Sequence, residues 1–283
     1  MDILKKVIIP TEINGRKVTK ICDGAFRNSQ ISLIEFGTPD NIYYIGISAF
    51  HNCVNLEKID IPNIKYIFAN TFENCINLSE VNIPQSVIQI NKFAFKNCGL
   101  NNIVIPGGVK NIESNAFSDC PYLKSVTILE GVEKIGWAAF AATDLETVNI
   151  PSSVKRIETY AFNECRKLKN VTISEGIEEI GSYAFNNCQN IGDVQIPASV
   201  KKIEAYAFNK CWFTKIGTFT FNRKSDFEYD YYMFLNCNNV TIYVLESAKN
   251  NYIDNDGNNS IFYDIKTERI KTFYILSVKG FYI

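Results

Sequence analysis

Phenylalanine returns along this chain at a nearly constant spacing, and that spacing restricts the folds open to the chain. Ten phenylalanines, most of them preceded by alanine, are separated by 22 to 26 residues. A repeat of this length cannot bury its apolar face alone, so successive units must stack on one another. The sequence therefore predicts a solenoid of about ten coils. The ten residues are Phe26, Phe50, Phe72, Phe95, Phe117, Phe140, Phe162, Phe185, Phe208 and Phe234.

Each repeat contains the same order of short segments. Leu168–Ile173 alternates in the way of a short strand with one buried face. Pro151 follows the strand of the preceding unit and ends it, because proline has no N–H for a ladder. Val154–Ile157 predicts a second extended piece. Thr159–Cys165 does not alternate, and we interpret it as one helical turn on the outside of the coil.

The repeat sets the expected organisation of the chain. We expect the solenoid to span 1–245, with 1–25 as an N-terminal capping coil that contains a turn at Asn14-Gly15. Val240–Val244 is expected to be the last regular strand, and 246–283 a C-terminal cap or tail. Within the irregular end we expect a polar loop at 223–230, a short helix at Glu246–Ile253, a loop at Asp254–Ser260 and one or two strands in 261–283.

Eight of the nine cysteines occupy one slot, three residues after a repeat phenylalanine. Thr143 and Ser29 fill the same slot in other units, which indicates that the slot selects a small side chain. We expect a column of buried free thiols. Disulfides are the alternative, but stacked cysteines would have parallel Cβ bonds, which is a poor geometry for a bridge. With His51 as the only histidine, a zinc site has little support.

Two further columns face outward. Charges before the repeat isoleucine alternate in sign between Lys155-Arg156, Glu178-Glu179 and Lys201-Lys202, which predicts a ladder of cross-strand ion pairs. A charged docking strip is the alternative. An aromatic column stands two residues before the phenylalanine, and we expect it to seal the edge of the core or to anchor a partner. Its members are Phe93, Tyr160, Tyr183, Tyr206 and Tyr232.

The inner strand face is the surface on which solenoids usually bind partners. Its expected side chains are short, polar and able to form hydrogen bonds, so they suit a wide protein or glycan contact better than a deep small-molecule pocket. The candidate residues on this face are Thr147, Asn149, Lys169, Asn170, Thr172 and Gln195.

Several functional classes find no support in the sequence. With 29 basic and 30 acidic residues, the chain lacks the charge excess of nucleic-acid binders. It also lacks an apolar run of the roughly 18 residues that a membrane helix needs, and we expect no cofactor and no metal. A polysaccharide-degrading parallel β-helix remains an alternative, but the outward strand positions bring only Asp60 as a carboxylate, and such enzymes use pairs.

The units resemble the BspA-type, or Treponema pallidum-type, leucine-rich repeats. The resemblance rests on Ile-Pro-x-x-Val-x-x-Ile-x-x-x-Ala-Phe-x-x-Cys-x-x-Leu over residues 7–245, and on the opening segment Ile9–Phe26. It implies a β-rich, right-handed superhelix with a parallel sheet on the inner face. It also implies surface or secreted proteins of bacteria and some protists that take part in adhesion and are not known as enzymes.

From these observations we expect a non-enzymatic, monomeric scaffold that binds a protein or glycan. The resemblance implies an extracellular or cell-surface location. No secretory leader is visible at Met1–Lys6, so a location inside the cell stays open. A structural or self-associating role is the second hypothesis, and the β-helix enzyme is the third.

Overall fold

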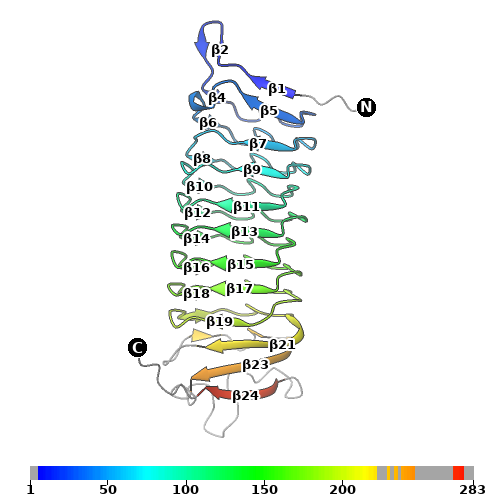
Figure 1. Ribbon diagram of the computed structural model, residues 1–283, viewed down its shortest axis with the longest axis vertical. Helices are drawn as coiled ribbons and strands as arrows, with labels where there is room; N and C mark the ends of the chain where they lie inside the picture. The colour runs from blue at the N-terminus through cyan, green and yellow to red at the C-terminus, as the bar shows by residue number, and fades with distance from the viewer. Residues whose placement is uncertain (1–5, 222–227, 230–232, 235–236, 246–269, 277–283) are drawn as a thin grey trace.

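The computed structural model describes residues 6–221, 228–229, 233–234, 237–245 and 270–276. Figure 1 shows an elongated stack of coils, with a long strand and a two-residue strand in each regular coil. The structure has about nine turns of the solenoid, where the count of phenylalanines predicted ten. The predicted repeat architecture is therefore confirmed, with a slightly smaller number of coils.

Within each inner sheet the long strands pair in parallel with their neighbours, as predicted for the inner face. Residues on these strands alternate between exposed and buried in β11, β13, β15 and β17. They form three four-stranded sheets in the orders β1-β5-β7-β9, β11-β13-β15-β17 and β19-β21-β23-β24. Their bounds are β1 Lys6–Ile9, β5 Leu33–Phe36, β7 Lys58–Asp60, β9 Glu80–Asn82, β11 Asn102–Ile105, β13 Ser125–Ile128, β15 Thr147–Ile150, β17 Asn170–Ile173, β19 Val194–Ile196, β21 Trp212–Phe221, β23 Asn238–Leu245 and β24 Ile270–Leu276.

The second extended piece of each repeat forms a separate parallel sheet. From β8 to β20 its first residue is exposed or half-buried and its second, an isoleucine, is buried. Eight strands stack in the order β22-β20-β18-β16-β14-β12-β10-β8, and β4 pairs with β6. Their bounds are β4 Lys20–Ile21, β6 Tyr44–Ile45, β8 Tyr66–Ile67, β10 Gln89–Ile90, β12 Asn111–Ile112, β14 Lys134–Ile135, β16 Arg156–Ile157, β18 Glu179–Ile180, β20 Lys202–Ile203 and β22 Glu228–Tyr229.

The segment around each phenylalanine is not the helical turn that the sequence suggested. Tyr160 and Glu164 have φ values of 61° and 60°, which no right-handed helix contains. The N–H of Ala161 donates to Glu158 in its own coil, whereas the N–H of Phe162 donates to Ala184 in the next. Two tight turns replace the helix because the next coil satisfies half of the backbone donors. In the described residues the single helical element is the 3-10 turn η1, Pro39–Asn41.

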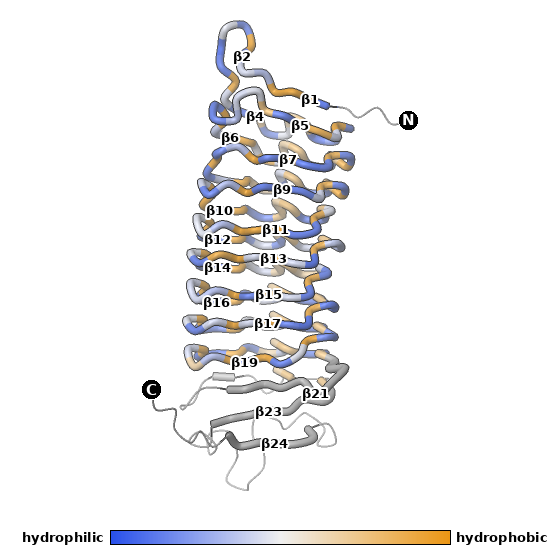
Figure 2. The backbone as a smooth tube through the Cα atoms, viewed as in Figure 1, coloured by the Kyte–Doolittle hydropathy of each residue, from blue (hydrophilic) through white to orange (hydrophobic). Residues whose placement is uncertain are grey.

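The phenylalanines form one continuous column through the core. Neighbouring ring centroids lie 5.1 to 5.6 Å apart, with interplanar angles of 2° to 24°. From Phe50 onward each ring is almost fully buried, and burial of each is worth roughly 1.5–3 kcal/mol. Figure 2 shows hydrophobic and hydrophilic residues alternating around the coils from β5 to β19, as stacking of one-sided units requires.

The cysteines form a second buried column beside the phenylalanines. All nine cysteines are free, and eight are buried, which confirms the prediction of a thiol column. Each of the eight donates its S–H to the backbone oxygen of a repeat phenylalanine in a preceding coil, at 2.8 to 3.3 Å. Thr143 fits the same slot, and its hydroxyl donates to the Phe140 carbonyl at 2.9 Å. Burial raises the pKa of Cys53 and Cys165 to about 11 and that of Cys120 to about 12.

The first coil contains the predicted turn. Asn14 and Gly15 have φ values of 52° and 73° and join β2, Glu12–Ile13, to the antiparallel β3, Arg16–Lys17. Asparagine and glycine are the residues that tolerate two successive positive φ angles. β1 pairs with β5, so the coil continues the inner sheet and does not stand apart from it.

At the other end, β23 contains the strand expected at Val240–Val244, and β24, which pairs with it in parallel, confirms a strand in the tail 261–283. The predicted segments Glu246–Ile253 and Asp254–Ser260, and Tyr232, lie outside the described residues. Of the loop expected at 223–230, only Glu228–Tyr229 is described, and there the loop prediction is wrong, because these residues form β22 and pair with β20. The division of the chain at residue 245 stays a prediction.

Candidate functional site

The structure brings together most of the residues predicted on the strand face. Thr147 and Asn149 of β15 lie beside Asn170 and Thr172 of β17, in register. All four are exposed, and the residues between them are buried. Gln195 is exposed on β19, one coil further along. We call the exposed residues of β11, β13, β15, β17 and β19 the strand face.

Ion pairs border the strand face where the strands begin. Lys169 Nζ lies 3.0 Å from a Glu146 carboxylate oxygen, and Lys167 lies 2.6 Å from Asp144. The hydrogen bond from Lys169 lowers the pKa of Glu146, and the hydrogen bond to Asp144 raises the pKa of Lys167. Each pair joins one acidic and one basic side chain. The centre of the face is therefore uncharged and offers hydroxyl and amide groups, with compensated charges along one border.

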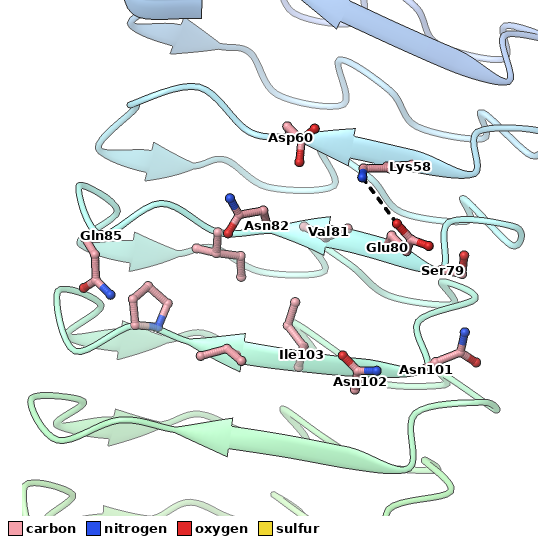
Figure 3. A pocket seen from close by; sticks show the side chains of 13 residues that line it. Lys58, Asp60, Ser79, Glu80, Val81, Asn82, Gln85, Asn101, Asn102 and Ile103 are labelled. Carbon is pink, nitrogen blue, oxygen red and sulfur yellow. Dashed lines mark ion pairs between the residues drawn. The ribbon is translucent and has the colours of Figure 1, made fainter.

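Within the described residues the inner sheet is interrupted twice, between β17 and β19 and between β9 and β11, which the sequence did not predict. β9 pairs with β7 and β11 with β13, but within the described residues the sheet order does not join β9 to β11. A groove of about 580 Å³ lies at this gap, lined by residues of β7, β9 and β11 (Figure 3). Val81 of β9 is only half-buried, whereas the equivalent Val148 and Val171 are buried.

The short loop at Cys98-Gly99-Leu100 is the one signal in the sequence for this gap. It is not sufficient, because the coil at Leu145 is equally short and its strand stays paired.

This groove does not present the paired carboxylates of a glycosidase. Glu80 is bound to Lys58 at 3.4 Å, as the dashed line in Figure 3 marks, which leaves Asp60 facing Asn82 of the next strand. In glycosidases one carboxyl group acts as acid and a second, unpaired one as base or nucleophile. The groove lining therefore lends no support to the β-helix enzyme alternative.

The three tyrosines of the aromatic column stack on one another but lie apart from the strand face. Tyr160 and Tyr183 have ring centroids 4.9 Å apart, and Tyr183 and Tyr206 are 4.8 Å apart. Each is half-buried on the turns that follow the short strands. Burial, with the two flanking tyrosines, raises the pKa of Tyr183. The predicted binding residues therefore fall on two separate surfaces of the coil.

The alternating charges form the predicted ladder. Arg156 contacts Glu179 of the next coil at 2.5 Å and Glu204 of the coil after that at 3.1 Å. Lys201 binds Glu178 at 2.6 Å, and this bond lowers the pKa of Glu178. These charges are used between coils, which favours the stabilising interpretation over a docking strip.

A ladder of asparagine side chains runs along the N-terminal half of the turn stack, and the sequence reasoning missed it. The amide of Asn52 donates to Asn28, that of Asn74 to Asn52 and that of Asn97 to Asn74, at 2.9 to 3.0 Å. All four have positive φ, a conformation that asparagine tolerates better than most residues. Asparagine two residues after the repeat phenylalanine was the available signal.

Neither a metal centre nor a membrane segment is found in the described residues. No group of three or more His, Cys, Asp or Glu side chains is placed there to hold a metal ion. His51 is half-buried, with Nδ1 3.3 Å from a Glu73 carboxylate oxygen. No helix in the described part of the chain is long and apolar enough to cross a membrane.

Comparison with known proteins agrees with the geometry. A profile of the BspA type leucine rich repeat region, in six copies, matches residues 3–124, 44–169, 88–215 and 156–277. The chain belongs to this family. A search of curated proteins found no match.

Several solved structures are similar to this chain. A leucine-rich repeat protein from Bacteroides ovatus is similar with a TM-score of 0.73 and 25% identity, over 85% of this chain and 63% of that one. The T. pallidum leucine rich repeat protein is similar with a TM-score of 0.50 and 28% identity, over 66% and 77%. The pneumococcal vaccine antigen PcpA shares the fold, with a TM-score of 0.53 and 20% identity over 87% and 85%. This BspA-type chain thus spans less than two thirds of the length of the Bacteroides protein.

Proposed function

We propose that this BspA-type protein is a non-enzymatic binding scaffold that recognises a protein or glycan partner through its strand face. One observation carries the proposal: Thr147, Asn149, Asn170 and Thr172 lie exposed and in register on strands whose alternate residues are all buried. Extended faces of this kind are the binding surfaces of solenoids. Because these side chains do not pack in the core, they are available to contact a partner.

We propose a cell-surface or secreted location for this scaffold. The support is family membership, together with a fold neighbour described as a vaccine antigen of a pneumococcus. A partner at a surface also suits the chemistry of the strand face, because short polar groups spread over several coils favour many modest contacts. The proposed role is attachment to host or microbial partners, with the chain acting as a monomer.

Self-association is the second candidate, and one observation favours it. β1 ends the inner sheet, pairs with β5 in the described residues, and carries Ile8 at 58% exposure. An exposed strand edge with an apolar side chain is a template for pairing with another chain. Sedimentation at increasing protein concentration distinguishes this candidate from the monomeric scaffold.

The test of the binding proposal is a matched pair of double variants. Asn149→Arg with Thr172→Arg places two long cations on the strand face. Tyr66→Arg with Ile88→Arg adds the same charges to the short-strand sheet, where Arg156 and Lys110 occupy the equivalent slots. Each protein is passed over immobilised extracellular matrix proteins and over whole cells of several types.

We expect the wild type and the short-strand variant to bind the same targets, and the strand-face variant to lose at least tenfold in affinity. Equal binding by the two variants, or no binding by the wild type, contradicts the proposal.

A further inference from the structure

A cavity opens in the outer surface of the turn stack at one coil. Ala138, Ala141 and Ala142 occupy three slots on this surface, and their side chains end at Cβ. The next coil fills the same slots with the longer side chains Tyr160, Asn163 and Glu164. The cavity measures about 480 Å³, within the roughly 300–1,000 Å³ of small-ligand sites.

Two aromatic rings form one wall of this cavity. Trp137 is 47% exposed, unusual for so large an apolar side chain. Its ring meets Tyr160 edge-on, with centroids 5.7 Å apart and an interplanar angle of 74°. Tyr160 is in turn held by stacking on Tyr183. The wall is therefore fixed in position before a ligand binds, and the exposed indole ring gives the ligand an apolar surface to pack on.

Polar groups surround the apolar floor. Asn163 accepts a hydrogen bond from Asn186 at 2.6 Å through its oxygen, which leaves its NH₂ group as a donor at the cavity. Asp119 and Glu164 bring carboxylate oxygens, which accept hydrogen bonds. Their charges are compensated by Lys96 at 3.5 Å from Asp119 and by Arg166 at 2.9 Å from Glu164. Ser118, 2% exposed, also lines the cavity.

The ligand that fits must combine an apolar face with a rim of hydroxyl groups. A pyranose ring has both: its C–H face packs on an aromatic ring, and its hydroxyls donate and accept hydrogen bonds. A purely apolar ligand would leave the NH₂ group of Asn163 without a partner, which is costly. An acidic sugar would place its carboxylate beside two others.

We propose that this cavity is a binding site for one or two rings of a neutral glycan, with Trp137 as the stacking platform and Asn163, Asp119 and Glu164 as hydrogen-bonding partners. The site lies on the turns, apart from the strand face, so it goes beyond the function proposed above. Either site can fail while the other holds, because they are tested with different probes and different variants.

The test is isothermal titration of the full chain with cellotetraose, mannotetraose and N-acetylchitotetraose, with an oligogalacturonate as the acidic comparison. Trp137→Ala removes the platform. Ala141→Asn with Ala142→Asn fills the cavity with side chains that neighbouring coils already hold at these slots, such as Asn163 and Asn187. Ala142 has a φ of 55°, which asparagine tolerates, so this double variant is expected to fold at least as stably as the wild type.

We expect one or more neutral oligosaccharides to bind the wild type, and both cavity variants to lose at least tenfold in affinity. The variant Tyr66→Arg with Ile88→Arg, on the short-strand sheet, should bind as the wild type does. The inference is overturned if none of the three neutral oligosaccharides binds, if the oligogalacturonate binds as tightly as they do, or if the filled cavity binds unchanged.

Discussion

The turn stack has an inner side, which faces the core, and an outer side, which faces solvent, and the two sides differ in how far their residue types repeat from coil to coil. On the inner side, every regular coil presents a phenylalanine and then a cysteine, threonine or serine. On the outer side, two residues before the phenylalanine, the same backbone position holds Ser48, Asn70, Asn115, Ala138 and Tyr160 in different coils. All of these outer residues have positive φ. The inner slots are therefore specified by stacking, whereas the outer slots share a backbone conformation but no side-chain type.

At the outer slots, side-chain choice is not explained by the stability of the fold alone. An L-residue in the left-handed region costs roughly 1–2 kcal/mol, least for glycine and asparagine. Tyr160, Tyr183 and Tyr206 adopt this conformation without that advantage. Stacking of their rings stabilises the protein by about 0.5–1.5 kcal/mol for each pair. Tyrosine is thus not the residue that stability alone would select there.

The largest expected difference in the free energy of unfolding is between two alanine substitutions, one on each side of the same turn. Phe117→Ala removes a fully buried ring that stacks on both neighbours, and we expect it to lower the free energy of unfolding by about 3–5 kcal/mol. Asn115→Ala, on the outer side, should lower it by about 1–2 kcal/mol at most, because alanine is less tolerant of its φ of 55°. Urea denaturation measures both, and equal losses would contradict the distinction.

The cysteine column makes the inner side sensitive to alkali. Burial raises the pKa of Cys165 to about 11, above the ordinary value of about 8.5. Because the thiol stays protonated longer in the folded protein than in the unfolded chain, the free energy of unfolding keeps its full value below pH ~8.5. It falls as the pH rises from there toward 11. Each such thiol should reduce the free energy of unfolding by about 1.4 kcal/mol per pH unit across this range.

Cys165→Thr tests this effect with a side chain that Thr143 shows to fit the slot. Denaturation midpoints at pH 7 and at several values between 8.5 and 10.5 should show a shallower decline for the variant. A decline of the same slope would show that the thiol does not titrate on unfolding in this range.

The asparagine ladder offers a smaller and separable effect. Asn74→Ala breaks two amide hydrogen bonds and places alanine at a φ of 62°, so we expect a loss of about 1–2 kcal/mol. Asn74→Gly loses the same bonds but tolerates the backbone angle. Thermal melts of both variants divide the cost: a glycine variant as unstable as the alanine variant would assign it to the ladder and not to the backbone.

The ion-pair ladder is expected to matter least. Arg156→Met removes contacts with Glu158, Glu179 and Glu204, yet the arginine is 38% exposed and its charge is screened. We expect a loss of about 1 kcal/mol or less in low salt, and a smaller one in 1 M NaCl. A loss that does not change with salt would show that Arg156 acts through packing of its stem.

Most of the fold was accessible from the sequence because the repeat places each apolar residue in a column. The spacing of Phe162 and Cys165 was enough to predict the stacked coils and the free thiols. The turn conformation was not, because the donors that would close a helix at Phe162 go to the next coil, and a single unit does not show this. The gap between β9 and β11 also depends on contacts between coils.

The candidate site was predictable only in part. Alternation placed Thr147, Asn149, Asn170 and Thr172 correctly on the exposed face of their strands. The cavity beside Trp137 was not predicted, since it comes from three alanines whose short side chains leave a space only when their neighbours are in place. The repeat predicts the residues that occur in every coil, whereas this cavity is formed by residues that differ from the repeat in one coil.

The most direct test of this division between core and surface measures partner binding and thermal stability on the same preparation of the Asn149→Arg, Thr172→Arg variant. We expect a melting temperature within about 2 °C of the wild type, since both residues are exposed, together with at least a tenfold loss of affinity for the partner that the wild type captures. Unchanged affinity at an unchanged melting temperature would contradict this expectation.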